Sequence, residues 1–225
     1  MSKTTRQPKV FMMDLWATVP YYTAYLSKAL LAEGVDVQVG SITYYLDPQC
    51  FSSRGIKLDP GVMDVVGRFN LPQLPRRLFK LAEALLNLFA LTLRFLARPP
   101  NVIHVQYLPM LKWRVPVDLW FLELCRQRGV KIVLTVHDLL PHDTAEAYKQ
   151  TFHDLYQMVD GMICHSDHIK KRLHDEFDVD GKRVAVIPHG PFFYDLHATK
   201  DAEIVRQFGV EPGQVVVLWQ GIIFP

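Results

Sequence analysis

Residues 131–146 read KIVLTVHDLLPHDTAE, and this stretch indicates both the kind of sheet and the place where its chemistry lies. The run KIVLTV is apolar and rich in β-branched residues, which is typical of a strand buried on both faces. It stops at His137 and Asp138, and a second pair, His142 and Asp143, follows soon after. Three explanations are open for these groups: a metal site, a catalytic site or a polar turn.

Apolar runs of the same kind recur along the chain and alternate with helix-like segments. This regular alternation predicts an α/β fold, a doubly wound parallel Rossmann-like sheet with helices on both faces. Residues 43–72 are expected to be irregular, Gly34 is expected to end the first helix, and Ser166 to cap the last. Strands are predicted at residues 9–15, 35–42, 102–107, 130–136, 161–165 and 183–190, and helices at 21–34, 74–98, 115–129, 144–159 and 167–177.

The alternation breaks at residues 191–200, and a helix (201–209) and a strand (214–221) are predicted after the break. One helix and one strand cannot form a domain. We therefore expect an N-terminal Rossmann-like domain over residues 1–195. Residues 196–225 are predicted to be a linker with the first helix and strand of a second Rossmann-like domain, whose remainder lies in a longer natural protein or in a separate chain.

The composition indicates a globular protein. Among the 225 residues the net charge is only +2, which gives no argument for nucleic acid as a partner. Three scattered cysteines, Cys50, Cys125 and Cys164, fit a reducing compartment better than a disulfide framework. The first residues, MSKTTRQPK, do not resemble a signal peptide. We expect a cytoplasmic protein.

The predicted helix at 74–98 is rich in Leu and Phe and carries five basic residues against one acid, Glu83. Its charged residues make it a poor membrane-spanning helix. Two interpretations remain open: a helix lying on an anionic membrane surface at the cytosolic face, or a core helix with charged ends. The five basic residues are Arg76, Arg77, Lys80, Arg94 and Arg98.

Polar side chains gather where the predicted strands end. In open parallel sheets, ligands bind beyond the carboxyl ends of the strands. Of the residues at these ends we expect His137 to be functional. Ser166 is expected to cap the following helix, and Asp138 is expected to stabilise the turn after its strand. The candidates, in chain order, are Asp14, Trp16, Gln106, Tyr107, His137, Asp138, His165, Ser166, His189 and Gly190.

Other sites are disfavoured by the sequence. The histidines lack HExxH spacing and have no cysteine pair beside them, so we predict no metal site. The first loop, DLWATVPYY, has no glycine, which argues against a dinucleotide cofactor, and neither a P-loop nor a GxSxG motif is present. His104 is predicted to be a hydrogen-bonded core residue, and Asp143 with Glu146 is predicted to form a helix capping box.

Five short blocks, in order, resemble the retaining glycosyltransferases of family four, which have the GT-B fold. The blocks are VIHVQ (102–106), VLTVHDLLP (133–141), MICHSDHIKKRL (162–173), VAVIPHG (184–190) and VVVLWQGIIFP (215–225). The resemblance implies two facing Rossmann-like domains, an N-terminal one for the acceptor and a C-terminal one for a nucleotide sugar, UDP- or GDP-linked. It also implies a transferase with no bound cofactor, because the nucleotide sugar is a substrate.

The resemblance also implies roles for residues. His137 matches the family's histidine near the donor sugar and diphosphate, where a hydrogen-bond donor stabilises the sugar or the departing phosphate. The donor-side cleft then includes Asp138, His165, Ser166, His189 and Gly190. The resemblance implies that the acceptor is bound by Asp14, Trp16, Tyr21, Tyr22, Gln106 and Tyr107. A hydrophobic staple at the start of the first helix is an equally good explanation for Tyr21 or Tyr22.

Three functions remain open at this point. The first is one part of a retaining transferase that moves a sugar to a glycan or lipid-linked acceptor, inactive without its donor half. The second is a non-catalytic acceptor-binding subunit that works with a separate donor subunit. The third is a metal hydrolase that uses the histidines.

Overall fold

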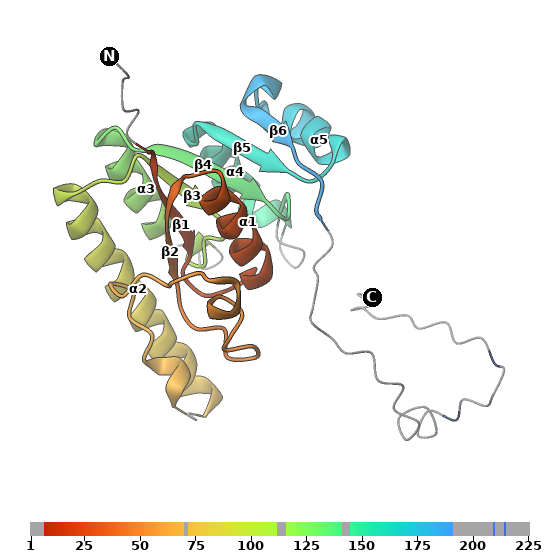
Figure 1. Cartoon of the computed structure of the whole chain (residues 1–225). Helices are drawn as coiled ribbons and strands as arrows, with labels where there is room; N and C mark the ends of the chain where they lie inside the picture. Colours follow the sequence, from red (N-terminus) through yellow and green to blue (C-terminus); the bar gives the residue numbers. More distant parts are fainter. Residues whose placement is uncertain are drawn as a thin grey trace, which may run out of the picture. The chain divides into compact units, whose positions relative to one another are not determined.

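The computed structural model describes residues 7–69, 72–111, 116–140 and 145–190, together with Gly209 and Gln214. Residues 1–190 form one compact unit built on a six-stranded parallel sheet with strand order β2-β1-β3-β4-β5-β6 (Figure 1). The predicted α/β, Rossmann-like class is therefore confirmed. The strands are β1 (Lys9–Asp14), β2 (Asp36–Ser41), β3 (Val102–Val105), β4 (Lys131–Val136), β5 (Gly161–Cys164) and β6 (Val184–Val186).

The helices follow the strands as the alternation predicts. They are α1 (Pro20–Ala32), α2 (Gln73–Ala97), α3 (Val117–Gln127), α4 (Ala145–Met158) and α5 (Asp167–Phe177), with short 3-10 turns at Ser52–Arg54, Val66–Arg68 and Gly181–Arg183. Gly34 follows α1 with a left-handed φ of 78°, and the Ser166 hydroxyl accepts from the Ile169 amide at 3.3 Å. Both predicted helix ends are confirmed.

The last predicted strand is the clearest correction. Residues 183–190 were expected to be a strand, but β6 has only three residues. The Ile187 amide still donates to the Cys164 carbonyl at 2.8 Å, and Pro188, which follows, has no N–H with which to extend the ladder. The capping box predicted for Asp143, and the domain predicted over residues 196–225, lie outside the described residues apart from Gly209 and Gln214.

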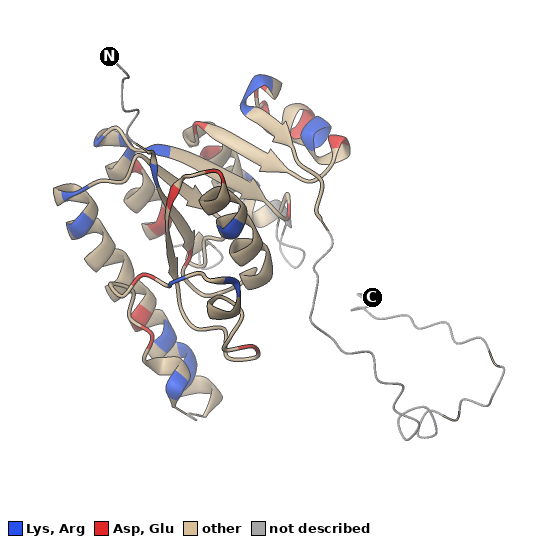
Figure 2. Ribbon diagram, viewed as in Figure 1, with Lys and Arg blue, Asp and Glu red and all other residues tan. Residues whose placement is uncertain are grey.

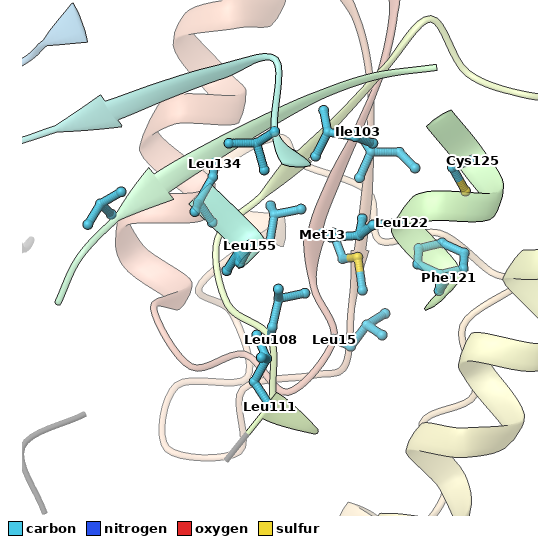
Figure 3. Close-up of a cluster of buried hydrophobic side chains, with 14 of the residues drawn as sticks. Met13, Leu15, Ile103, Leu108, Leu111, Phe121, Leu122, Cys125, Leu134 and Leu155 are labelled. Carbon is cyan, nitrogen blue, oxygen red and sulfur yellow. The ribbon is translucent and has the colours of Figure 1, made fainter. Parts of the chain in front are cut away.

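The sheet has an apolar face and a polar face, because side chains alternate along each strand. The apolar face packs against α2, α3, α4 and α5 in the main core. Figure 3 shows the part of this core to which α3 and α4 contribute. On the polar face, α1 packs through Ala24 against Met12 and Val39. The apolar face carries Phe11, Met13, Ile103, Val105, Ile132, Leu134, Val136, Met162, Cys164 and Val184, and the polar face carries Met12, Asp14, His104, Gln106, Thr135 and His137.

Helix α2 contributes to the core through one side only. Ala84, Leu88, Leu91 and Phe95 are buried in the main core, so the core-helix interpretation holds for this side. No helix in the described part of the chain is long and apolar enough to cross a membrane.

The polar residues inside α2 hold the preceding irregular segment in place. Asp59 receives two hydrogen bonds from the Arg94 guanidinium, at 2.8 and 2.6 Å. The Glu83 carboxylate accepts from the Val65 and Val66 amides at 2.6 and 3.0 Å, and Asn87 bonds both the amide and the carbonyl of Met63. These residues interrupt the apolar run in the sequence because they face a loop and not the core.

Candidate functional site

The loop after β1 is shaped by the buried carboxylate of Asp14. Its oxygens accept hydrogen bonds from the Thr18 amide at 2.8 Å, the Val19 amide at 3.1 Å and the Thr23 hydroxyl at 3.1 Å. Burial raises the pKa of this carboxyl, and the three hydrogen bonds oppose that rise. Because the side chain is buried and its oxygens are used within the loop, the structure places Asp14 as a residue that positions α1.

The glycine-free loop still contains one left-handed residue. Ala17 has a φ of 49°, and its amide donates to the Asp14 carbonyl at 2.9 Å. A non-glycine residue in this region carries a steric cost of about 1–2 kcal/mol. The loop therefore makes its sharp turn without a glycine.

Tyr22, which this loop positions, is the centre of a group of aromatic rings. Its ring lies edge-on to His137 at a centroid distance of 4.9 Å, and 5.2 Å and 5.3 Å from the rings of His165 and His189. His165 is in turn 5.4 Å from His137 and 5.1 Å from His189. We call these four residues the Tyr22–histidine cluster. It lies beyond the carboxyl ends of β4, β5 and β6, where parallel sheets bind ligands.

His137 is held in one orientation by Gln106. The two side chains meet at 3.1 Å, between His137 Nε2 and Gln106 Oε1, and Gln106 Nε2 donates to Met12 Sδ at 3.1 Å. Gln106 is buried, so its amide has little freedom to reorient. With the amide assigned in this way, His137 Nε2 carries the proton and Nδ1 carries a lone pair.

His137 is neutral at pH 7. Burial, followed by the neighbouring histidines, lowers the pKa of its imidazole to about 4. The family resemblance implies a hydrogen-bond donor at this position. In the tautomer that Gln106 selects, the second ring nitrogen of His137 is instead an acceptor, which suits a hydroxyl group of a ligand.

His165 and His189 have their tautomers fixed by backbone carbonyls. His165 Nδ1 donates to the Ile187 carbonyl at 3.0 Å, and His189 Nδ1 donates to the Gly190 carbonyl at 3.1 Å. Nε2 of His165 is buried and has no hydrogen-bond partner among the described residues. A buried acceptor in this state costs free energy until a donor reaches it, so the cluster is suited to a ligand that brings O–H groups.

Two side chains on the polar face of the sheet, Thr135 and His104, support the Tyr22–histidine cluster. The Thr135 hydroxyl interacts with the Tyr22 phenol, whose pKa is raised by burial, and lies 2.9 Å from Nε2 of His104. His104 is buried and hydrogen-bonded, as predicted, and burial lowers its pKa to about 4. Thr135 is not among the residues predicted from the sequence. The alternation of side chains along a strand is a signal that points to it, because Thr135 lies two residues before His137 on the same face.

The other predicted site residues are dispersed. Trp16 packs against the main core, and Tyr21 donates to Asp47 at 3.0 Å and packs edge-on to Tyr44. Tyr107 is half-buried, and burial followed by the nearby carboxylate of Asp138 raises its pKa. Asp138 and Gly190 are exposed, and Ser166 uses its hydroxyl to cap α5. The structure thus brings together Tyr22, Gln106, His137, His165 and His189 from the predicted set.

The histidines of the cluster do not form a metal centre in the described residues. No group of three or more His, Cys, Asp or Glu side chains there has the geometry to hold a metal ion. The three cysteines are buried and free. The geometry of the Tyr22–histidine cluster is that of a hydrogen-bonding and stacking site.

Comparison with known proteins identifies a protein family whose model covers this site. The family model described as Glycosyltransferase Family 4 matches residues 19–190, a range that includes all four residues of the Tyr22–histidine cluster. No curated protein matches the chain significantly.

Solved structures share the fold at low sequence identity. A glycosyltransferase from Rickettsia africae ESF-5 is similar with a TM-score of 0.52 and 13% identity, over 93% of this chain and 51% of that one. A putative UDP-N-acetylglucosamine 2-epimerase from Listeria monocytogenes gives 0.54 and 15%, over 80% and 45%. Anabaena Alr3699/HepE, in complex with UDP and glucose, gives 0.50 and 14%, over 91% and 50%. The chain therefore spans about half the length of these structures.

Proposed function

The chain belongs to glycosyltransferase family 4, and from this premise we propose that it is the acceptor half of a sugar-transferring enzyme. The complete enzyme moves a hexose from a UDP- or GDP-sugar to a glycan or lipid-linked acceptor with retention of configuration. The donor half binds the nucleotide and lies outside residues 1–190. The 225-residue chain alone is inactive.

The observation that carries this proposal is the Tyr22–histidine cluster. It offers the flat ring of Tyr22 for stacking, together with ring nitrogens whose tautomers are fixed before any ligand arrives. Fixed hydrogen-bonding groups need no reorganisation during reaction, and this is a principal source of catalytic stabilisation. The unpartnered Nε2 of His165 gains a hydrogen bond when a hydroxyl of the substrate enters.

In this proposal His137 is the catalytic residue. Its lone pair at Nδ1 accepts from a sugar hydroxyl, and Gln106 keeps that nitrogen unprotonated and correctly aimed. Retention requires the acceptor oxygen to bond to the sugar on the side from which the phosphate leaves. A residue that fixes the sugar ring at that point lowers the entropic part of the barrier.

The test is a transfer assay with labelled UDP- and GDP-sugars, using both glycan and lipid-linked acceptors. We expect turnover from the protein that contains both halves and none from the 225-residue chain. His137→Ala should lower kcat/KM on the order of a hundredfold. His168→Ala, at an exposed position on α5, is the matched control and should leave kcat/KM unchanged.

Two results would contradict the proposal. One is full activity in the His137→Ala enzyme. The other is binding of an acceptor without transfer from any donor by the two-half protein, which would identify a non-catalytic acceptor-binding subunit. Turnover by the 225-residue chain would overturn the statement that this half is inactive alone.

A further inference from the structure

Helix α2 has a second apolar side that no described part of the chain covers. Leu78, Leu85, Leu86, Phe89 and Leu93 recur at helical spacing and are exposed, with Leu78 at 60% and Phe89 at 63% of their full accessibility. This exposed stripe lies on the side of α2 opposite the buried Ala84, Leu88, Leu91 and Phe95. A contiguous apolar surface of this kind marks an interaction site on most proteins.

A nearby loop contacts the cationic side of α2 at its N-terminal end. The Arg76 guanidinium and the Lys80 ammonium lie 5.3 and 5.4 Å from the centroid of the Tyr45 ring. Tyr45 and the following Leu46 are themselves exposed, at 54% and 71%. The first turns of α2 and this loop therefore form one surface that contains both apolar and cationic groups.

The charge of this end of α2 is positive and uncompensated. Among the described residues Arg76, Arg77 and Lys80 make no ion pair, and Figure 2 shows them as blue bands on the lower part of the helix. The only acid of α2, Glu83, is buried and its carboxylate is occupied by loop amides. An apolar stripe with cations on the other side of the same helix is the pattern of a helix that lies in a bilayer interface.

The helix also reaches the end of the sheet where the Tyr22–histidine cluster lies. With 25 residues α2 is about 37 Å long, whereas the six-residue strand β4 is about 20 Å long. Since α2 ends just before β3 begins, it starts beyond the carboxyl ends of the strands, as Figure 1 shows. Its cationic turns are therefore at the carboxyl end of the sheet.

We propose that the exposed stripe of α2 binds the surface of an anionic lipid bilayer, with the long side chains of Arg76, Arg77 and Lys80 reaching its phosphate groups. A second copy of the chain would bring the same cationic end and no complementary charge, whereas anionic headgroups supply it. The surface does not depend on the transferase function, and its test needs no turnover.

The experiment is co-sedimentation of the full 225-residue chain with vesicles. One set contains 30% phosphatidylglycerol in phosphatidylcholine, and the other is pure phosphatidylcholine. We expect binding to the first set, at least tenfold weaker binding to the second, and a decrease as salt is raised. The triple variant Arg76→Gln/Arg77→Gln/Lys80→Gln should bind anionic vesicles on the order of a hundredfold more weakly. Each lost charge accounts for a decrease in affinity of about tenfold or less.

A second variant and a matched control separate the apolar and electrostatic contributions. Leu78→Gln/Leu86→Gln/Phe89→Gln should abolish binding to both vesicle sets, and its unfolding midpoint should stay unchanged because these side chains are exposed. Lys9→Gln/Lys28→Gln/Lys57→Gln removes the same charge from other exposed positions and should bind within twofold of the parent chain.

Each contrary result overturns the proposal. No sedimentation of the parent chain with anionic vesicles would do so, as would equal loss of binding in the lysine control. A dimeric parent chain whose apolar variant becomes monomeric would show that a second copy, and not lipid, covers the stripe. None of these outcomes bears on sugar transfer, so this proposal and the proposed function fail separately.

Discussion

The two faces of the central sheet differ in what their side chains do. On strand β4, Ile132 and Leu134 are buried among apolar neighbours from the helices of the main core. Thr135 and His137 point to the other face, where Thr135 interacts with Tyr22 and His104 and His137 bonds to Gln106. The same strand thus supplies stability on one face and positions a candidate site on the other.

The largest expected effect is on the apolar face. Ile132→Ala removes a fully buried side chain from the centre of the sheet and should lower the free energy of unfolding by roughly 2–5 kcal/mol. Urea unfolding followed by circular dichroism measures this change. His137→Ala, at the end of the same strand and half-buried, is the matched control. A loss for His137→Ala as large as that for Ile132→Ala would remove the distinction between the faces.

The next largest effect is a pH dependence of the unfolding free energy that arises from histidines on the polar face. His104 and His137 have folded-state pKa values of about 4, below the ordinary value of 6.5. Between pH 6.5 and 4 the unfolded chain binds protons at these groups and the folded chain does not, so stability falls as the pH is lowered. Each group contributes up to roughly 3 kcal/mol across this window.

A buried carboxyl changes the pH dependence of stability in the direction opposite to that of the histidines. Burial raises the pKa of Asp118 to about 6, so the folded chain retains a proton there and gains stability as the pH falls below that value. The histidine contribution is therefore isolated by comparing the parent chain with His104→Gln in urea titrations at pH 7, 5.5 and 4.5. The variant should lose less stability on acidification, and an identical pH profile would contradict the low pKa of His104.

A smaller effect is expected at the loop that leads to Tyr22. Asp14→Ala leaves two amides and one hydroxyl without their acceptor and should cost about 2 kcal/mol of unfolding free energy. It should also release Tyr22 from the histidine rings, which a change in the aromatic side-chain resonances of the nuclear magnetic resonance spectrum would show. Loss of stability with unchanged Tyr22 contacts would show that Asp14 does not position the cluster.

The smallest effect has the opposite sign. Ala17→Gly relieves the left-handed conformation and should raise the unfolding free energy by about 0.5–1 kcal/mol after the extra entropy of the unfolded glycine is subtracted. Ala29→Gly, at an exposed position within helix α1, is the control and should lower it by about 1 kcal/mol. Destabilisation by Ala17→Gly would show that the alanine methyl, buried in the main core, outweighs the relief of strain.

The sequence predicted the sheet well because its signal is local. Runs such as KIVLTV, and end signals such as Gly34 and Ser166, need no knowledge of distant residues. The candidate site was predicted only in outline. That strands β4, β5 and β6 end near one another follows from the parallel alternation, but the position of Tyr22 among three histidines depends on how α1 packs across the sheet.

Helix α2 shows why the rest could not be predicted. Its apolar residues occupy two opposite sides, and its polar residues Glu83, Asn87 and Arg94 bind a loop that is irregular and more than fifteen residues away in the sequence. A single-helix pattern cannot show which apolar side the core covers. Asp14 shows a similar limit, because a carboxylate at the end of a strand looks the same in sequence whether it binds a ligand or a loop.

The most direct test of the central claim is kcat/KM per folded molecule for Ile132→Ala and His137→Ala, measured side by side in the protein that carries both halves. We predict that Ile132→Ala keeps kcat/KM within a few-fold of the parent, while His137→Ala lowers it on the order of a hundredfold at nearly unchanged stability. A loss of turnover in Ile132→Ala with full activity in His137→Ala would contradict the assignment of the chemistry to the polar face.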